Sequence, residues 1–523
     1  MPRKMGDSRI DEGLVAVDAY TKHSPCLSQM SVFTFPSLTL VVTAVCLSAL
    51  AQPPLHAEIQ PTLAPMSGSL ELSDFDLTLV DQTWGTAQRD RSVKGKPLRI
   101  KNVAFKRGIG THADSRWSLF LDGGAKRFQA QVGVDDAAGK GGSVKFSVIG
   151  DGKELWNSGV CKSGAPAVAA DVDVTSVLYL TLIADGGGDG IGEDHADWAE
   201  PRLGGLSKRP VPVARVPGEE GMILPGRQWI DMDGKPIQAH GGGVFEHLGR
   251  YYWYGEDRSD GYVGIGVAGY ISDNLVRWKK LGTVLPRSAY DKHKAKTICE
   301  RPKVIYNPKT KQFVMWFHFD KTGYGDSQAG VAVASTPAGP FRYLGEHRPV
   351  ARSTYRDMNL FVDDDGQAYS IYSGEENQTM HIVRLKPDWT EEEKPMVEGK
   401  TWARILEKRA RESPALFKHA GKYYLFTSGT TGWNPNPADL AVADNVLGPY
   451  KQLGNPCTGP NSNTTFRTQN TCIIPAPGKP PGHFIYMGDR WKPEALADSR
   501  YIWLPFEVKE SGTTLEWVDS WKP

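Results

Sequence analysis

This chain has few cysteines, almost no net charge and only one long apolar run. The 523 residues contain 6 cysteines, and no two of them have the Cys-x-x-Cys spacing of a zinc or thioredoxin-like site. Basic and acidic residues nearly balance, for a formal net charge of +1. The charge therefore gives no electrostatic reason to expect nucleic acid or an anionic membrane as a partner.

The one long apolar stretch runs from Leu38 to Ala51. At about 14 residues it is too short to cross a bilayer as a helix. It ends in the small-x-small pattern Ala49-Leu50-Ala51, with a second option at His56-Ala57, and this predicts a secretory signal peptide within a leader of residues 1–57. We therefore expect export to the periplasm or the extracellular space, with no membrane segment after cleavage. A buried core helix, or initiation at Met30, is the alternative.

Removal of this leader would leave Cys161, Cys299, Cys457 and Cys472. Cys457 and Cys472 flank one loop near the C-terminus. In an oxidising compartment they could form a disulfide.

Glycine, proline and aromatic residues are plentiful, with 56 Gly, 36 Pro, 15 Trp and 19 Tyr, which favours a turn-rich all-β chain. A unit of a short apolar strand, a turn and an aromatic-rich strand recurs five times in the C-terminal part, at intervals of about 54 to 62 residues. Such a period predicts a five-bladed β-propeller over residues 222–523. Its aromatic strands include Tyr251–Glu256 and Tyr423–Gly429.

The N-terminal block, residues 68–206, instead alternates period-two strands with glycine turns. This pattern predicts an antiparallel β-sandwich. The proline-rich segment 207–221 reads as a semi-rigid linker between the two domains.

Polar residues stand directly before the first strand of each predicted blade, so we expect them to line a central funnel. They are His240, Glu300, Asp357, Glu412 and Gln469. A ring with several carboxyl groups suits glycoside hydrolysis, which needs one protonated carboxyl group for the leaving oxygen and a second group to handle water.

Seven motifs of the C-terminal domain stand out together, namely Gln238–Gly243, Tyr251–Glu256, Glu300–Asn307, Arg356–Phe361, Glu412–Phe417, Thr430–Trp433 and Gly488–Trp491. On these motifs the domain resembles glycoside hydrolase family 43, and within it the exo-β-1,3-galactanase-like members. The resemblance implies an inverting enzyme with Glu412 as general acid and Asp357 as the group that tunes its pKa. It also implies that Gln469 positions water and that Glu300 supports the substrate.

Most of this family carries an aspartate as general base in the first blade, where this chain has Ala239-His240. This difference matches the galactanase branch. The resemblance also implies sugar contacts from His240, Glu256, Tyr324, Thr431, Gly432 and Trp433. For an inverting enzyme, we expect roughly 6.5 to 9.5 Å between Glu412 and Gln469.

The N-terminal block carries its own run of motifs, among them Trp84-Gly85, Gly108–Ala113, Val132–Asp136 and Asp194–Ala199. On these motifs it resembles the NPCBM domain, a predicted carbohydrate-binding module with a galactose-binding-like fold. Trp84, His112, His195 and Trp198 are the candidates for a sugar platform, because an aromatic face stacks on the apolar face of a pyranose. The alternative is that the segment His195–Trp198 is a structural turn.

No cofactor or metal is expected in catalysis, although the resemblance allows a structural Ca²⁺. The run Asp363-Asp364-Asp365 is explained as a turn. The expected partner is a polysaccharide or oligosaccharide, and the sequence does not indicate an oligomeric state. Two alternatives to a galactanase stay open. One is another family 43 specificity, namely α-L-arabinofuranosidase, β-xylosidase or galactofuranosidase, and the other is a non-catalytic carbohydrate-binding protein.

Overall fold

Antiparallel strands make up nearly all the regular structure of the computed structural model, which describes residues 68–291 and 296–523. Within these ranges the only helices are short 3-10 turns, and none is long and apolar enough to cross a membrane. The all-β prediction is therefore confirmed. The predicted leader lies outside the described residues. The 3-10 turns are η1 (Leu72–Asp74), η2 (Arg287–Ala289), η3 (Ser462–Thr464) and η4 (Leu496–Asp498).

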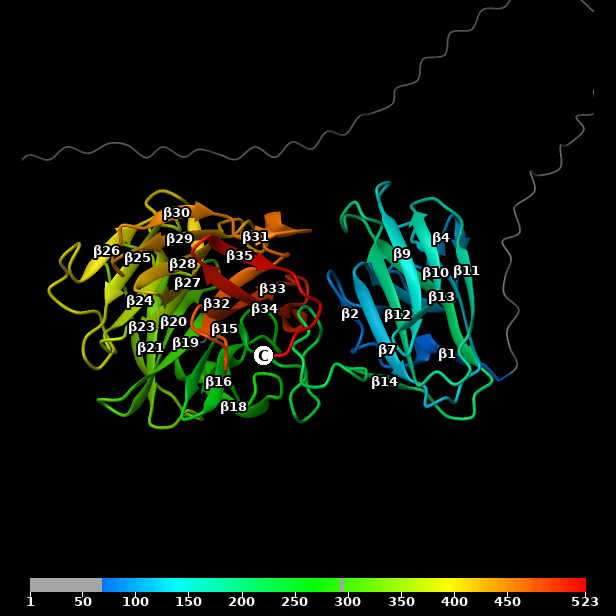
Figure 1. The fold of residues 1–523 in the computed structure, drawn as a ribbon, viewed down its shortest axis with the longest axis horizontal. Helices are drawn as coiled ribbons and strands as arrows, with labels where there is room; N and C mark the ends of the chain where they lie inside the picture. The colour runs from blue at the N-terminus through cyan, green and yellow to red at the C-terminus, as the bar shows by residue number, and fades with distance from the viewer. Residues whose placement is uncertain (1–67, 292–295) are drawn as a thin grey trace, which may run out of the picture. The chain divides into compact units, whose positions relative to one another are not determined.

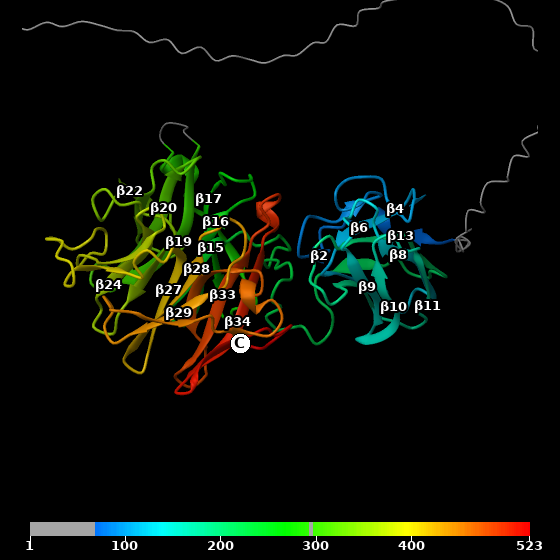
Figure 2. The same ribbon diagram turned by 90° about the horizontal axis from the view of Figure 1, so that it is seen from above.

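Two six-stranded sheets form the N-terminal region (Figures 1 and 2). The first has the order β11-β8-β13-β6-β3, with β1 added against β13, and the second has the order β10-β9-β12-β7-β14, with β2 added against β7. The first sheet consists of β1 (Leu70–Glu71), β3 (Gln88–Arg89), β6 (Gly108–His112), β8 (Arg127–Val134), β11 (Val168–Asp173) and β13 (His195–Gly204). The second consists of β2 (Asp81–Gln82), β7 (Ser115–Phe120), β9 (Ser143–Gly150), β10 (Lys153–Lys162), β12 (Tyr179–Gly186) and β14 (Val211–Val213). A separate hairpin joins β4 (Arg99–Ile100) to β5 (Val103–Ala104).

One hydrophobic core is shared by these two sheets, as the alternating apolar residues of a sandwich require. Trp198 belongs to this core. Its side chain is 3% exposed and meets the ring of Phe146 edge-on at 5.2 Å. The prediction that Trp198 stacks on a sugar is therefore wrong, because the ring would have to leave the core to do so.

The predicted linker begins inside the sandwich. Strand β14 lies within residues 207–221 and pairs with β7. Any linker is thus shorter than the proline-rich composition suggests.

Five further sheets follow along the chain, and each contains one copy of the predicted repeat, whose first strand we call the leading strand. Four have simple sequential order, and the fifth has the order β31-β35-β34-β33-β32. The first two sheets are β15 (His240–His247), β16 (Arg250–Asp257), β17 (Gly266–Ser272), β18 (Lys279–Pro286), and β19 (Thr297–Asn307), β20 (Gln312–Lys321), β21 (Gln328–Ala334), β22 (Arg342–His347). The third and fourth are β23 (Met358–Val362), β24 (Ala368–Gly374), β25 (Thr379–Arg384), β26 (Trp402–Ile405), and β27 (Arg411–His419), β28 (Lys422–Gly429), β29 (Asp439–Ala443), β30 (Lys451–Gly454). The fifth is β31 (Cys457–Thr458), β32 (Gln469–Pro475), β33 (His483–Arg490), β34 (Arg500–Lys509) and β35 (Gly512–Glu516).

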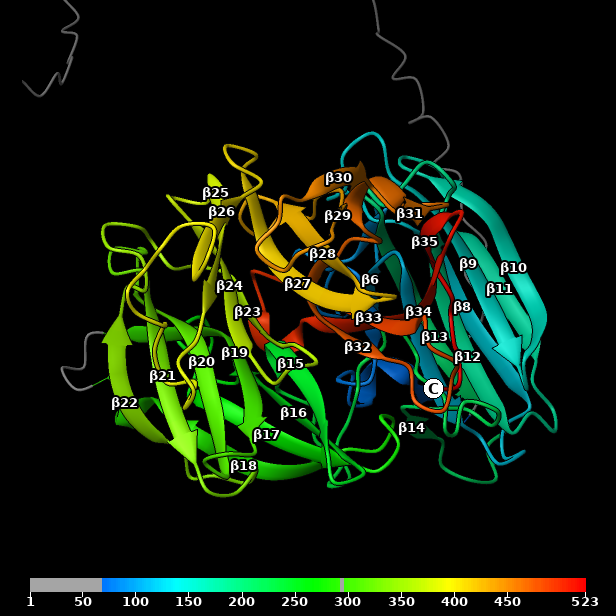
Figure 3. The same ribbon diagram turned by 60° about the vertical axis from the view of Figure 1, so that its left-hand side comes forward.

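The leading strands of these five sheets lie around a common centre (Figure 3). Strand β15 contacts β19, β19 contacts β23, β23 contacts β27, β27 contacts β32, and β32 returns to β15. The last sheet is tied to the first by the Ala239 amide, which donates to the Tyr501 hydroxyl at 2.9 Å. Residues just before or at the start of the leading strands are thereby brought towards one another.

In three of these leading strands, a β-bulge comes directly after the polar residue that was predicted to line the funnel. Register shifts occur after His240, Glu300 and Glu412, and the next residue in each case has left-handed backbone. These residues are Gly241 (φ 58°), Arg301 (φ 55°) and Ser413 (φ 52°). A bulge bends the strand and re-aims the side chains beside it. The repeat therefore sets side-chain direction as well as strand position.

The two C-terminal cysteines do not pair. All four described cysteines are free and buried. Cys457 begins β31 and Cys472 lies in β32, and these strands form opposite edges of the fifth sheet. The Cys457–Cys472 disulfide that the sequence left open is therefore not formed, because the loop between the two cysteines spans the width of the sheet.

Candidate active site

A cavity of about 300 Å³ lies where the leading strands converge. Eight of the ten side chains predicted for the catalytic domain line it, from all five C-terminal sheets or the loops that follow their strands. They are Glu256, Glu300, Tyr324, Asp357, Glu412, Gly432, Trp433 and Gln469. The equivalent positions in the repeat thus supply the walls of one small polar cavity.

Glu412 is the carboxyl group best suited to hold a proton. Its residue is 7% exposed, and burial, together with the charge of nearby Asp357, raises its pKa to about 8. Its Oε1 accepts from Gln469 Nε2 at 2.7 Å, and its Oε2 accepts from Asn377 Nδ2 at 3.4 Å. Glu412 therefore stays mostly protonated at neutral pH, as a general acid requires.

Hydrogen bonds to both the carbonyl oxygen and the NH₂ group orient the side-chain amide of Gln469. Its carbonyl oxygen accepts from Trp491 Nε1 at 2.9 Å and from the Arg301 guanidinium. Its NH₂ group donates to Glu412, so these two side chains are in direct contact. The predicted separation of roughly 6.5 to 9.5 Å between Glu412 and Gln469 is therefore wrong for this pair.

Arg301 connects the second, third and fifth sheets. Its guanidinium meets Asp357 Oδ2 at 3.0 Å and donates to the Asn470 carbonyl at 3.0 Å, in addition to the Gln469 contact. Asp357 also accepts a hydrogen bond of 2.6 Å from the Ser413 hydroxyl, beside Glu412. The buried cation thus fixes Asp357 and Gln469 on either side of the acid.

Glu300 is ionised, whereas Glu412 is protonated. Burial alone would raise its pKa, but its contacts with His318 and with the Arg258 charge outweigh burial and lower it to about 2. The Tyr324 hydroxyl donates to its Oε1 at 3.0 Å, and His318 Nδ1 lies 3.3 Å from its Oε2. Glu300 is thus a permanent carboxylate.

His318 supplies positive charge to this carboxylate. Burial opposes its protonation, but Asp320 and Glu300 flank the ring and together raise its pKa to about 9. The Asp320 contact, from His318 Nε2 to Oδ2, is 2.9 Å. A protonated imidazole between two carboxylates therefore forms the base of the cavity wall behind Glu300.

Glu256 is also fully enclosed. Its Oε1 accepts the backbone N–H of Arg301 at 2.8 Å, and its Oε2 accepts from Arg258 Nε at 2.7 Å. Arg258 reaches Glu300 as well, at 3.2 Å. One guanidinium therefore bridges two of the carboxyl groups predicted from the sequence.

His240 does not line the cavity, contrary to the prediction. It is fully buried, stacks on Tyr501 with ring centroids 5.1 Å apart, and burial lowers its pKa to about 3. Its cross-strand neighbour Glu256 lines the cavity instead. At Gly241 an added Cβ would lie 2.3 Å from a Glu256 oxygen, so this glycine lets the carboxylate take the position.

Thr431 is the second predicted contact that is not in the cavity wall. Its hydroxyl donates to the Asn434 carbonyl at 3.0 Å and accepts from Asn436 at 2.7 Å, which stabilises its own loop. Thr430 lines the cavity in its place.

Several cavity residues were not predicted as functional. Arg301 and Trp491 belong to motifs that carry the family resemblance, but nothing in their spacing marks them as contacts of Gln469. His318 lies in an aromatic strand, where a lone histidine reads as core. The residues missed are Arg258, Arg301, His318, Arg356, Asn377, Thr430 and Trp491.

Three of the four predicted sandwich residues do meet. The Trp84 ring stacks on His195 at 5.9 Å, and the His112 ring lies 5.1 Å from Trp84. Both histidines are buried, and burial lowers the pKa of each. Trp84 alone is exposed, at 38%.

Among the described residues, no group of three or more His, Cys, Asp or Glu side chains is arranged to hold a metal ion. In the turn at Asp363, the carboxylate accepts from Lys418 and Tyr423 at 2.6 Å each. That carboxylate is therefore committed to protein partners.

Two known families match separate parts of this chain. Residues 68–204 match the NPCBM/NEW2 domain, and residues 244–472 match the glycosyl hydrolases family 43. A solved GH43 β-1,3-galactosidase, in complex with galactodeoxynojirimycin, is 39% identical with a TM-score of 0.54, and the match covers 58% of this chain and 100% of that one. The chain belongs to glycoside hydrolase family 43.

Two further solved structures are exo-β-1,3-galactanases. The enzyme from Clostridium thermocellum is 40% identical with a TM-score of 0.53, over 58% of this chain and 67% of that one. The enzyme from Phanerochaete chrysosporium, in a substituted form with β-1,3-galactotriose, is 33% identical with a TM-score of 0.53, over 58% and 68%.

Curated relatives match shorter stretches. A putative endo-α-N-acetylgalactosaminidase of Renibacterium salmoninarum is 31% identical over 141 residues, and α-1,3-galactosidase B of Akkermansia muciniphila is 33% identical over 165 residues. The matches cover 26% and 30% of this chain, but it spans only 9% and 20% of the lengths of these two relatives.

The charged state of His318 predicts a pH-dependent contribution to stability. Its pKa is about 9 in the fold against an ordinary 6.5, so the stabilisation is complete below pH 6.5 and is lost as pH rises through about 9. His318→Gln leaves Asp320 buried without its cation, and Glu300 keeps only one of its two cations, Arg258. We expect it to cost about 3–5 kcal/mol at pH 6 and clearly less at pH 10.

Thermal unfolding of both proteins at the two pH values measures this difference. His483→Gln is the matched control, because that side chain is 35% exposed and lies 4.0 Å from its acidic neighbour. A loss of stability from His318→Gln that is the same at pH 6 and pH 10 would contradict the assignment.

Proposed function

We propose that this protein is an exported, inverting glycoside hydrolase that releases galactose from the non-reducing end of β-1,3-galactan. Three of the similar solved proteins are named for action on β-1,3-linked galactose. The cavity of about 300 Å³ suits one terminal sugar better than a length of chain, which favours exo-action. We further propose that the five C-terminal sheets are the blades of a five-bladed propeller.

The observation that carries this proposal is the opposite charge state of two carboxyl groups in one cavity. Glu412, with a pKa of about 8, has a proton to give, and Glu300, with a pKa of about 2, is an anion. Pairs of titratable groups whose environments separate their pKa values mark the acid and its counterpart.

In this mechanism Glu412 gives its proton to the glycosidic oxygen as the bond between that oxygen and the anomeric carbon breaks. A water attacks the same carbon from the opposite face and releases one proton to solvent as the new C–O bond forms, so the configuration is inverted and Glu412 is later reprotonated from solvent. The carboxylates of Glu300 and Asp357 stabilise the positive charge that develops on the sugar ring. Asp357 also favours the protonated form of Glu412.

Gln469 positions the water in this proposal. Its carbonyl oxygen already has two donors, and one hydrogen of its NH₂ group goes to Glu412. The second hydrogen is therefore the group with which Gln469 can hold a water oxygen, once bound substrate parts the amide from the acid that it contacts in this structure. An amide is a poor proton acceptor, so its part is placement of the nucleophile.

Galactose release from β-1,3-galacto-oligosaccharides tests the proposal, followed by chromatography beside aryl glycosides of arabinose and xylose. Glu412→Gln keeps the shape and removes the transferable proton, so kcat on the oligosaccharides should fall by about 10²- to 10⁴-fold. The loss should shrink on a nitrophenyl β-galactoside, whose leaving group needs little protonation.

Gln469→Ala is the matched comparison, because it should be slow on both substrates if water placement is lost. Hydrolysis of the oligosaccharides by Glu412→Gln at the unmutated rate would exclude Glu412 as the acid. Binding of galactan without any release of galactose by the unmutated protein would favour a carbohydrate-binding protein instead.

The pKa of Glu412 predicts the pH profile. Activity should fall as pH rises through about 8, because the acid then loses its proton. Asp357→Asn removes a negative charge beside Glu412 and frees the charge of Arg301, so both effects lower the pKa of the acid. We expect the alkaline limb of kcat/KM to move to lower pH.

Asp444→Asn serves as the control for this shift, since that carboxylate is 88% exposed and pairs with Lys422 outside the cavity. If the alkaline fall of kcat/KM stays at the same pH in Asp357→Asn, or moves equally in both variants, Asp357 does not raise the pKa of Glu412.

A further inference from the structure

The loop that carries Trp84 in the sandwich is fixed to the fifth C-terminal sheet. The Gly85 amide donates to Glu494 Oε1 at 2.8 Å, and Lys492 Nζ donates to the Gly85 carbonyl at 3.3 Å. Lys492 is itself buried and paired with Asp498 at 2.7 Å. All these residues belong to one compact unit of the chain. Both backbone groups of the residue after Trp84 are thus held by the catalytic domain.

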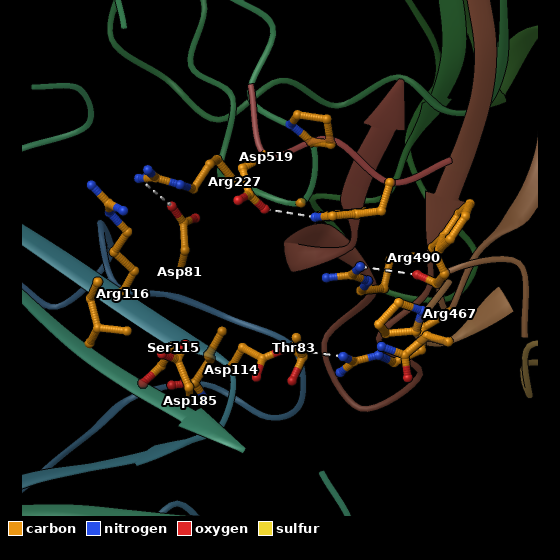
Figure 4. Close-up of a pocket in the computed structure, with 18 residues that line it drawn as sticks. Asp81, Thr83, Asp114, Ser115, Arg116, Asp185, Arg227, Arg467, Arg490 and Asp519 are labelled. Atoms are coloured by element: carbon orange, nitrogen blue, oxygen red, sulfur yellow. Dashed lines mark hydrogen bonds and ion pairs between the residues drawn. The ribbon is translucent and has the colours of Figure 1, made fainter. Parts of the chain in front are cut away.

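The same loop is anchored on its other side. The Thr83 hydroxyl donates to the Ala113 carbonyl at 2.6 Å, and neighbouring Asp114 accepts from Arg467 Nη2 at 3.0 Å. Figure 4 shows Thr83 and Asp114 beside Arg467, and all three line a second, strongly charged cavity of about 540 Å³. The position of Trp84 is therefore set from both domains.

Trp84 lines a groove of about 320 Å³ together with Trp433 and Trp491 of the catalytic domain. This groove and the catalytic cavity share four wall residues, namely Gly432, Trp433, Gln469 and Trp491. The two spaces are therefore neighbours along one wall, with Gln469 and Trp491 between them. Their similar volumes give the groove room for a further sugar unit.

The groove has the chemistry of a sugar site. One face of the Trp84 indole rests on His195, with the ring planes 14° apart, and 38% of the residue stays exposed. Nε and Nη1 of Arg467, which lines the same groove, are buried and have no hydrogen-bond partner among the described residues. Aromatic faces beside unused donors match the apolar faces and hydroxyl groups of a pyranose.

We infer that Trp84 forms part of a subsite for the leaving-group side of the substrate, so that the sandwich completes the substrate groove of the enzyme. This inference rests on the proposed function. When the terminal sugar fills the catalytic cavity, the rest of the oligosaccharide has to extend out of that cavity. The groove lined by Trp84 adjoins the cavity and can receive the next sugar units. The module then selects for chain length at the active site.

The test compares kcat/KM on β-1,3-galactotetraose with kcat/KM on β-galactosyl fluoride, whose leaving group occupies no sugar subsite. Trp84→Ala should lower the ratio of the two values roughly 3- to 10-fold, the effect of one lost aromatic stack. Trp84→Phe should recover most of the ratio. Trp156→Ala, in β10 of the same sandwich and away from the groove, is the matched control and should leave the ratio unchanged.

Glu494→Ala keeps the test decisive if Trp84→Ala folds poorly. Glu494 is an exposed residue of the catalytic domain, and its replacement removes the acceptor of the Gly85 amide. It should lower the same ratio. An unchanged ratio in Trp84→Ala and in Glu494→Ala would overturn the inference. Failure of the unmutated protein to release galactose from the tetrasaccharide would instead overturn the proposed function, and the inference with it.

Discussion

The buried guanidinium of Arg301 is the contact on which the rest of the site depends. It reaches Asp357, Gln469 and the backbone of the fifth sheet from a left-handed residue in a β-bulge. A buried cation without these partners would be strongly unfavourable, so the three groups and the bulge stabilise one arrangement together. Because Gln469 and Asp357 are the groups beside Glu412, the position and the pKa of the acid both follow from where this one cation is held.

The second constraint is that two enclosed carboxyl groups have opposite protonation states. Glu412 lies beside Asp357 and accepts only amide hydrogen bonds, and burial keeps it protonated. Glu300 is equally enclosed, but His318 and Arg258 hold it as an anion. The same residue type at equivalent points of the repeat thus serves two opposite purposes. The difference comes from the charged neighbours: His318 in β20 and Arg258 after β16 lie beside Glu300, whereas Asp357 before β23 lies beside Glu412.

The sequence predicted much of this arrangement and missed its charged supports. The repeat correctly predicted the five C-terminal sheets with Glu300 and Glu412 at matching positions, because period-two strands and turns are local signals. His240 stands at the same point of the repeat, yet its ring packs on Tyr501, since Gly241 admits the Glu256 carboxylate in its place. Arg301 could not be assigned, because its partners Gln469 and Asn470 lie far away in the chain. His318 lies close in the chain to Glu300 and Asp320, but a lone histidine in an aromatic strand reads as a core residue. The disulfide that the sequence left open between Cys457 and Cys472 does not form, because the two cysteines, although near in sequence, lie in strands at opposite edges of one sheet.

The central claim is that Glu412 protonates a galactosidic oxygen while water attacks from the opposite face. The anomeric form of the first product tests it most directly. Proton NMR of β-1,3-galacto-oligosaccharide hydrolysis, recorded before mutarotation, should show α-galactose appearing first. Initial release of β-galactose would contradict the account, because it requires a covalent intermediate on a carboxylate and two displacements instead of one.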